Sequence, residues 1–191
     1  MRRGRERGFT LIELAIIAVI VGVLSVLAVV GYRKWVTTSR LTEAQNMVSN
    51  IRSAEEAFKS ENGGYLTVSV AYAGTGNPSH DYPAATPGAF RTGWGADCPS
   101  TSCVKTNSWR QLGVQSVGPV MYGYAVVASN DTTSGPSTDI FINNVDTPLT
   151  SMKGAPWYVV EADGDPLGTG TFTKIFGLSG NNELFINGAG Q

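Results

Sequence analysis

The sequence predicts an α+β protein, in which a long amino-terminal helix packs its second half against a small antiparallel sheet. Three observations lead to this fold class. The run from Leu14 to Tyr32 carries no charged side chain, apolar residues then recur at intervals of three and four as far as Phe58, and the carboxyl-terminal part contains short runs rich in Val, Ile, Tyr and Phe. The first two patterns are typical of a helix, and the third is typical of strands separated by turns.

The composition and charge of the chain limit its function. The chain has 191 residues, of which 42% are hydrophobic and 15% are charged, so we expect one domain, or one domain plus an appendage, and no disordered polar chain. Residues 1–8 contain four arginines and one glutamate, whereas the net charge of the whole chain is −1, so the remainder is acidic. A basic surface for nucleic acid is therefore not expected, and no specific nucleic-acid partner is predicted.

The first half of the helix is long and apolar enough to cross a bilayer. The 19 residues from Leu14 to Tyr32 rise roughly 28 Å, close to the ~30 Å thickness of the hydrocarbon core. Twelve of them are Leu, Ile or Val, which together favour insertion by roughly 4–7 kcal/mol. The carboxylate of Glu13 would cost about 2.5–3.5 kcal/mol at the bilayer centre and less near the end. We therefore predict a membrane span over residues 9–32, with the arginines on the cytoplasmic side.

Glu13 needs an explanation, because a plain membrane anchor has no use for an acid. Charge alone leaves two alternatives. The side chain extends to the interface from the terminal turn, or it pairs with a positive charge inside the apolar surroundings.

The residues around Glu13 form a specific motif. They are Gly8-Phe9-Thr10-Leu11-Ile12-Glu13-Leu14, directly after a short Arg-rich leader and directly before the apolar run. This arrangement resembles the class III signal of type IV prepilins and of the related pseudopilins of type II secretion. The resemblance implies that a prepilin peptidase removes residues 1–8 by cutting between Gly8 and Phe9, and that Phe9 becomes the N-methylated amino terminus.

The same resemblance gives Glu13 a role in assembly. It implies that Glu13 of one subunit pairs with the amine of Phe9 in a neighbour and sets the register of helices in a filament. The implied partners are further copies of the chain, the prepilin peptidase and the pilus assembly machinery in the inner membrane. The precursor is expected in that membrane, and the product in an extracellular pilus at the cell surface. Val30 stands where many members have a proline, so melting of the helix on assembly stays open.

The sequence leaves several functions open, of which the first two agree with this resemblance. The first is a structural subunit of a type IV pilus that serves adhesion, motility or DNA uptake. The close alternative is a type II secretion pseudopilin or a minor pilin. An alternative of another class is a single-span, membrane-tethered binding module. The apolar segment can also be an ordinary secretory signal peptide cleaved after Val26-Leu27-Ala28, although it is longer than such signals and contains Glu13.

Residues 33–62 are expected to continue the helix as an amphipathic segment. The expected apolar stripe is formed by Leu41, Ala44, Val48, Ile51, Ala54 and Phe58. This spacing leaves the other faces to charged residues, namely Glu43, Arg52, Glu55, Glu56 and Lys59. The helix should end at Glu61-Asn62-Gly63-Gly64, because glycine adopts the left-handed cap conformation readily.

The globular head is predicted to cover residues 63–191. Residues 63–118 are rich in Gly, Pro, Ser and Thr and should form a long structured loop. Cys98 and Cys103 enclose four residues, which suits a small disulfide-closed loop in an oxidising compartment better than two free thiols. A sheet of three to five antiparallel strands is expected within residues 119–191. Its predicted strands are Val120–Ala128, Asp139–Asn143, Trp157–Ala162, Thr171–Leu178 and Glu183–Ile186.

Few residues suggest chemistry. Asp163 and Asp165 lie two residues apart in Asp163-Gly164-Asp165-Pro166, and this pair is a candidate calcium site, since hard cations favour carboxylate oxygens. The segment also looks similar to acidic loops that bind calcium in some pilins and pseudopilins. The alternative is a β-turn in which the Asp side chains cap backbone amides. No other cofactor is expected.

An enzyme is not predicted. His80 is the only histidine, and no Ser or Cys nucleophile accompanies it at a known spacing. His80 and Asp81 are therefore expected to be solvated loop residues. Trp94, Trp109 and Trp157 can bind sugars or surfaces, but most of them should stabilise the core or the loop.

Overall fold

A computed structural model describes residues 9–95, 97–142, 145–147 and 149–188. The expected leader, including Gly8 of the cleavage site, lies outside the described residues. The chain divides into two compact units, Met1–Thr38 and Ser39–Gln191, each of which is described separately below.

The helix α1 runs from Leu11 to Asn62. Its apolar part, in the first unit, has no buried residue within the most hydrophobic 18-residue window, whose mean hydropathy is 3.0. By length and composition this helix can cross a membrane. The hydroxyl of Ser25, inside the apolar run, donates to the carbonyl of Val21 at 2.7 Å. The helix therefore satisfies this polar group internally, as a helix in lipid must.

In the second unit, α1 places one face into the core. Ala44, Val48 and Ile51 are fully buried, and Leu41, Ala54 and Phe58 pack against the same cluster, as the stripe predicts. The expectation that Glu55 lies on another face is wrong, because Glu55 is fully buried. Glu55 follows Ile51 by four residues and so continues the buried face of the helix.

The end of α1 is the predicted one. Gly63 has φ +79°, and its N–H donates to the carbonyl of Lys59 at 2.8 Å. This left-handed residue gives one of the last helical carbonyls a hydrogen-bond donor and ends the helix.

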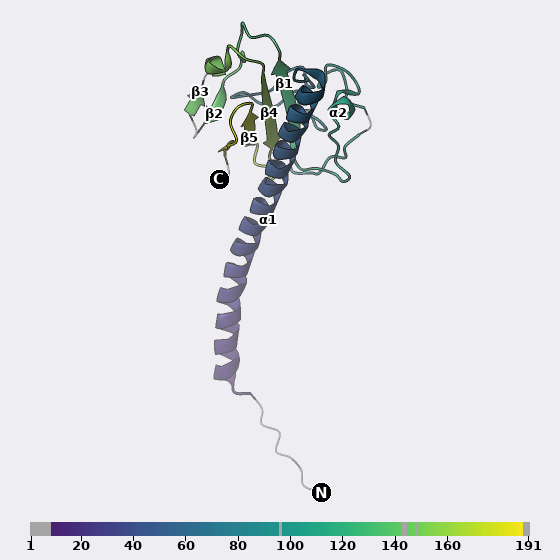
Figure 1. Cartoon of the computed structure of the whole chain (residues 1–191). Helices are drawn as coiled ribbons and strands as arrows, with labels where there is room; N and C mark the ends of the chain where they lie inside the picture. Colours follow the sequence, from purple (N-terminus) through teal and green to yellow (C-terminus); the bar gives the residue numbers. More distant parts are fainter. Residues whose placement is uncertain (1–8, 96, 143–144, 148, 189–191) are drawn as a thin grey trace. The chain divides into compact units, whose positions relative to one another are not determined.

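The head contains a four-stranded antiparallel sheet in the order β1-β4-β5-β6 (Figure 1). The strands are β1 (Gly123–Ser129), β4 (Trp157–Gly164), β5 (Thr173–Leu178) and β6 (Leu184–Asn187). A separate two-stranded sheet is formed by β2 (Ile140–Ile142) and β3 (Val145–Thr147). The α+β fold is confirmed, and the expected strand near residue 140 belongs to the smaller sheet. The strand β3 and the 3₁₀ helix η1 (Leu149–Met152) were not expected from the sequence.

The central strand β4 is longer than predicted and is buried along its whole length. The expected strand ends at Ala162, whereas β4 continues to Gly164 and so includes Asp163. Asp163 pairs in register with Lys174 of β5. Two charged residues thus face each other inside the sheet. The local sequence Asp163-Gly164-Asp165-Pro166 suggests a turn at this position instead.

A glycine lets α1 approach the sheet. A Cβ atom at Gly177 of β5 would lie 2.6 Å from Cδ of Arg52 and 3.0 Å from Cγ1 of Val48. A larger side chain at this position would push the helix away from the sheet. The guanidinium of Arg52 in turn donates to the carbonyl oxygens of Asn181 and Asn182, in the turn between β5 and β6.

The long loop is structured, as predicted, and lies along the free side of β1. Ser69 donates its N–H to the carbonyl of Val126 at 2.8 Å, and Val126 donates to the hydroxyl of Ser69 at 3.0 Å. Tyr82 and Tyr124 exchange two backbone hydrogen bonds of 3.0 and 2.8 Å. The peptide bond between Tyr82 and Pro83 is cis. The loop also contains a short helix, α2 (Ser108–Gln111).

The disulfide between Cys98 and Cys103 is confirmed. Both residues are buried in the main core cluster. Near them the indole rings of Trp94 and Trp109 lie edge to face, with ring centroids 5.3 Å apart, and Tyr82 contacts both. Trp109 and Trp157 are buried, so these tryptophans stabilise the head, as expected for most of them.

Candidate functional site

The first turn of α1 positions Glu13. Thr10 precedes the first helical residue, and its hydroxyl oxygen accepts a hydrogen bond from the N–H of Glu13 at 3.3 Å. The Oε2 atom of Glu13 accepts hydrogen bonds from the N–H of Thr10 at 3.1 Å and from its hydroxyl at 3.0 Å. This reciprocal arrangement is a capping box, which satisfies two backbone donors at the start of a helix.

The capping box gives Glu13 a local function in addition to the role in assembly that the resemblance implies. Its signal is present in the sequence, because Thr10-Leu11-Ile12-Glu13 has the spacing of Thr and Glu that this motif requires. The carboxylate lies beside the backbone of Thr10, the residue that follows Phe9. The carboxylate of Glu13 is therefore held one residue from Phe9, which cleavage after Gly8 would make the amino terminus.

The apolar residues from Phe9 to Trp35 form a continuous exposed surface in the described part of the first unit. Leu11, Ile12 and Leu14 are 88%, 69% and 63% exposed, and Phe9 is 78% exposed. The large side chains as far as Trp35 are exposed by about half or more. Such a surface is not stable in water and requires lipid or other apolar helices around it.

The structure gives different partners to the two carboxylates of the expected calcium site. Asp165 accepts hydrogen bonds from the backbone N–H groups of Thr169 at 2.9 Å and Gly170 at 2.7 Å. Burial raises the pKa of Asp165, but these hydrogen bonds lower it more, and the net pKa lies below its usual value. This is the cap that the alternative interpretation describes. Calcium binding by Asp163 and Asp165 stays a prediction.

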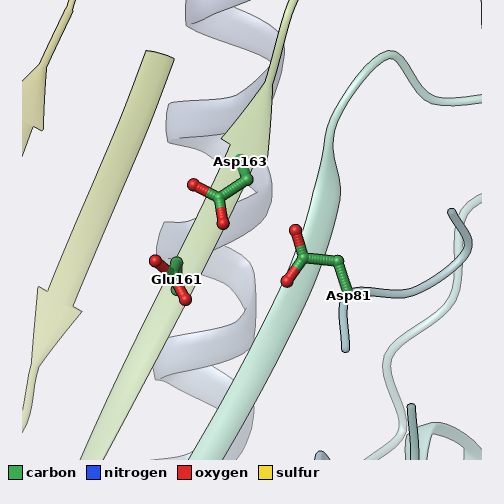
Figure 2. Close-up of side chains that lie close together, drawn as sticks. All are labelled: Asp81, Glu161 and Asp163. Carbon is green, nitrogen blue, oxygen red and sulfur yellow. The ribbon is translucent and has the colours of Figure 1, made fainter. Parts of the chain in front are cut away.

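Asp163 instead belongs to a buried cluster with Asp81, Glu161 and Lys174. Figure 2 shows the three carboxylates of this cluster. The Nζ atom of Lys174 lies 2.8 Å from Oδ1 of Asp163 and 3.2 Å from Oε1 of Glu161. The expectation that Asp81 is a solvated loop residue is wrong, because Asp81 is only 1% exposed. The backbone pairing of Tyr82 with Tyr124 brings the loop onto β1 and places Asp81 against the sheet.

The cluster has an excess of negative charge, because it contains three carboxylates and one ammonium group. Burial raises the pKa of Asp81 well above its usual value, and the carboxylates of Asp163 and Glu161 raise it further. Burial also raises the pKa values of Glu161 and Asp163, although Lys174 opposes both shifts. Burial lowers the pKa of Lys174, but the two carboxylates that it contacts raise it more. No sequence motif joins these residues, since Asp81 is 80 positions from Glu161.

Comparison with known protein families identifies the amino-terminal segment. Residues 3–29 match the family described as the prokaryotic N-terminal methylation motif. This match includes the expected cleavage site, Glu13 and most of the exposed apolar surface.

Curated relatives match a segment of 52–61 residues of this chain. The type IV major pilin protein PilA of Myxococcus xanthus is 38% identical over 61 residues, which are 32% of this chain and 28% of the relative. The fimbrial protein EcpC of Eikenella corrodens is 36% identical over 58 residues, which are 30% and 38% of the two chains. A fimbrial protein of Pseudomonas aeruginosa is 36% identical over 52 residues, which are 27% and 34%. The chain thus covers about a third of the length of these relatives, and no solved structure matches it significantly.

The resemblance therefore rests on a short segment of high specificity. Residues 3–29 carry the methylation motif, and about a third of the chain is similar to type IV pilin and fimbrial proteins.

Proposed function

We propose that this protein is a structural, non-enzymatic subunit of a type IV pilus. A prepilin peptidase cuts the precursor between Gly8 and Phe9 in the inner membrane and methylates Phe9, and the mature chain then polymerises through the apolar part of α1. The filament lies outside the cell and serves adhesion, motility or DNA uptake.

The observation that carries this proposal is the exposed apolar helix that begins directly at the methylation motif. Before assembly, lipid covers this surface. In the filament, sister helices cover it, and the burial of apolar side chains among them favours polymerisation at roughly 25 cal/mol per Å². Glu13 is already held at the start of the helix by Thr10. In a polymer it can compensate the amine of a neighbouring Phe9, which would otherwise be an unpaired charge in apolar surroundings.

The close alternative is a pseudopilin of type II secretion or a minor pilin, because the same motif and helix serve these proteins. The abundance of the protein distinguishes them. A major pilin dominates the filaments sheared from the cell surface, whereas a pseudopilin or minor pilin is scarce in that fraction.

The first test is amino-terminal sequencing, with intact mass, of the protein sheared from the cell surface. The proposal requires a chain that begins at N-methylated Phe9. A chain that begins at Val29 would instead identify a secretory signal, and an uncleaved chain that does not assemble would identify a membrane-tethered binding module.

The second test separates the charge of Glu13 from its capping function. Glu13→Leu should insert into the membrane and be processed but should yield few filaments. Thr10→Ala removes the cap at a cost of about 1 kcal/mol and keeps the carboxylate, so it should assemble at near-normal levels. Filaments of normal abundance in Glu13→Leu would exclude the pairing function.

A further inference from the structure

Two carboxylates of β4 and one from the distant loop meet at one buried point of the head. The possible ligand atoms of Asp81, Glu161 and Asp163 all lie within 4.8 Å of one another, and none of the three residues is more than 1% exposed. Figure 2 shows the carboxylate of Asp81, on the loop, directed toward Asp163 at the end of β4. Oxygens about 2.3–2.6 Å from one shared calcium ion lie at most about 5 Å apart, so this spacing suits a single ion.

The hydrogen bonds of the cluster leave several of these oxygens without a donor. Lys174 binds Oε1 of Glu161 and Oδ1 of Asp163, and the N–H of Ala73 donates to Oε2 of Glu161. Both oxygens of Asp81 and Oδ2 of Asp163 are buried and accept no hydrogen bond from an N–H or O–H group of the described residues. The polar contact left to them is the one between the two carboxyl groups, which requires a shared proton. Buried polar atoms normally have a partner, and each exception requires a specific explanation.

The charges of the cluster point to the same explanation. Three carboxylates face one ammonium group, so two negative charges are uncompensated when all the groups are ionised. Within the described part of the chain, Lys174 is the only cation that forms an ion pair with these carboxylates. One divalent cation would balance the remaining charge, and its own ligands would be the oxygens that Lys174 does not bind.

We propose that Asp81, Glu161 and Asp163 form a binding site for a hard divalent cation. Asp81 and Asp163 supply direct ligands through the oxygens that Lys174 does not bind, and Glu161 together with Lys174 holds Asp163 in place. A set of carboxylate oxygens without His or Cys favours Ca²⁺ or Mg²⁺ over transition metals. Ca²⁺ is the better fit, because it tolerates irregular geometry and accepts backbone carbonyls and waters as its remaining ligands, whereas Mg²⁺ demands near-ideal octahedral coordination.

This site differs from the pair that the sequence suggests. It replaces Asp165, whose carboxylate is used by two backbone N–H groups, with Asp81 from the loop. The approach of Asp81 depends on Gly123, because a Cβ atom there would lie 2.6 Å from Cβ of Asp81. A bound cation would therefore attach the loop to the central strand of the sheet, in addition to the backbone pairing of Tyr82 and Tyr124.

The test uses the full chain in detergent after removal of metal with EDTA. Thermal unfolding is followed by tryptophan fluorescence at neutral pH, without added metal and with millimolar CaCl₂ or MgCl₂. We expect calcium to raise the Tm of the wild type by about 5 °C or more, as preferential binding to the folded state requires. Asp81→Asn should lose this rise. Asp165→Asn is the matched control, because it changes a neighbouring carboxylate outside the cluster, and it should keep the rise.

Two outcomes would overturn the proposal. One is a wild-type Tm that neither ion changes, together with no stoichiometric metal by mass spectrometry after equilibrium dialysis against calcium. The charge would then be balanced by protons, and the wild type would gain stability on mild acidification. The other is loss of the calcium effect in Asp165→Asn but not in Asp81→Asn, which would place the ion at the turn. The direct calcium measurement on the wild type decides the matter even where Asp81→Asn does not fold, and neither readout depends on filament assembly.

Discussion

The Oε2 atom of Glu55, on the buried face of α1, accepts a hydrogen bond of 3.0 Å from the backbone N–H of Leu66. The two residues lie on either side of the turn that ends the helix. The second carboxylate oxygen of Glu55 is buried and has no hydrogen-bond partner among the described residues. Burial raises the pKa of Glu55 from 4.5 to about 7, against the opposing effect of this hydrogen bond.

The raised pKa of Glu55 predicts a specific pH dependence. The folded state holds this proton more tightly than the unfolded state, so its contribution to stability is complete below the ordinary pKa and is lost as the pH rises through about 7. Glu55→Gln cannot ionise. The free energy of unfolding of the variant should therefore rise relative to wild type by about 3 kcal/mol between acid and mildly alkaline pH. Urea unfolding of both proteins at several pH values measures this difference, and parallel pH profiles would contradict the prediction.

Glu55→Ala provides the comparison for the hydrogen bond itself. It leaves the N–H of Leu66 without its acceptor and should destabilise the head at every pH by about 1–3 kcal/mol.

Gly177 is predicted to be essential for the contact between helix and sheet. Gly177→Ala places a Cβ within 3.0 Å of Val48 and displaces Arg52, so we expect a loss of about 1–3 kcal/mol in the free energy of unfolding. Gly118→Ala is the control, because no atom lies within 4 Å of its Cβ position. Equal stability of the two variants would show that the helix can move without cost.

The disulfide is predicted to stabilise the loop. Replacing both cysteines by serine removes a short closed loop, for which the chain-entropy estimate is about 2 kcal/mol, and buries two hydroxyl groups. Urea unfolding of the double variant and of the reduced wild type should give similar losses. If the double variant were as stable as the oxidised wild type, the aromatic residues of the loop would be sufficient to keep it folded.

Lys174 is predicted to be necessary for the folded head at neutral and alkaline pH. Lys174→Met leaves Glu161 and Asp163 buried without their cation, which should cost about 3–5 kcal/mol in EDTA. Protonation removes the uncompensated charge, so part of this loss should be recovered as the pH falls. Lys153→Met, at an exposed position, should have little effect. Thermal unfolding of both variants across the pH range provides the measurement.

The parts of this fold that are local in sequence could be predicted from it. The apolar spacing gives the helix, Gly63 gives its end, and the close spacing of Cys98 and Cys103 gives the disulfide. The β-rich runs give the strands of the main sheet, with ends that differ by a few residues. In each case neighbouring residues determine the structure.

The buried charges could not be predicted in this way. Asp81 and Asp163 meet only because the loop pairs with β1, and Lys174 reaches Asp163 only through the register of β5 against β4. Both relationships join segments that are far apart along the chain. Glu55 is a different case. Its spacing from Ile51 already places it on the buried face of the helix, but a glutamate is normally expected at an exposed position.

The pairing of the loop with β1 has a consequence for association between copies of the chain. A strand at the edge of a sheet can recruit a strand from another molecule, which leads to amyloid-like aggregation. Here Thr67, Ser69 and Tyr82 occupy the backbone groups along the outer side of β1. A second copy therefore cannot add a strand to the sheet at the edge formed by β1.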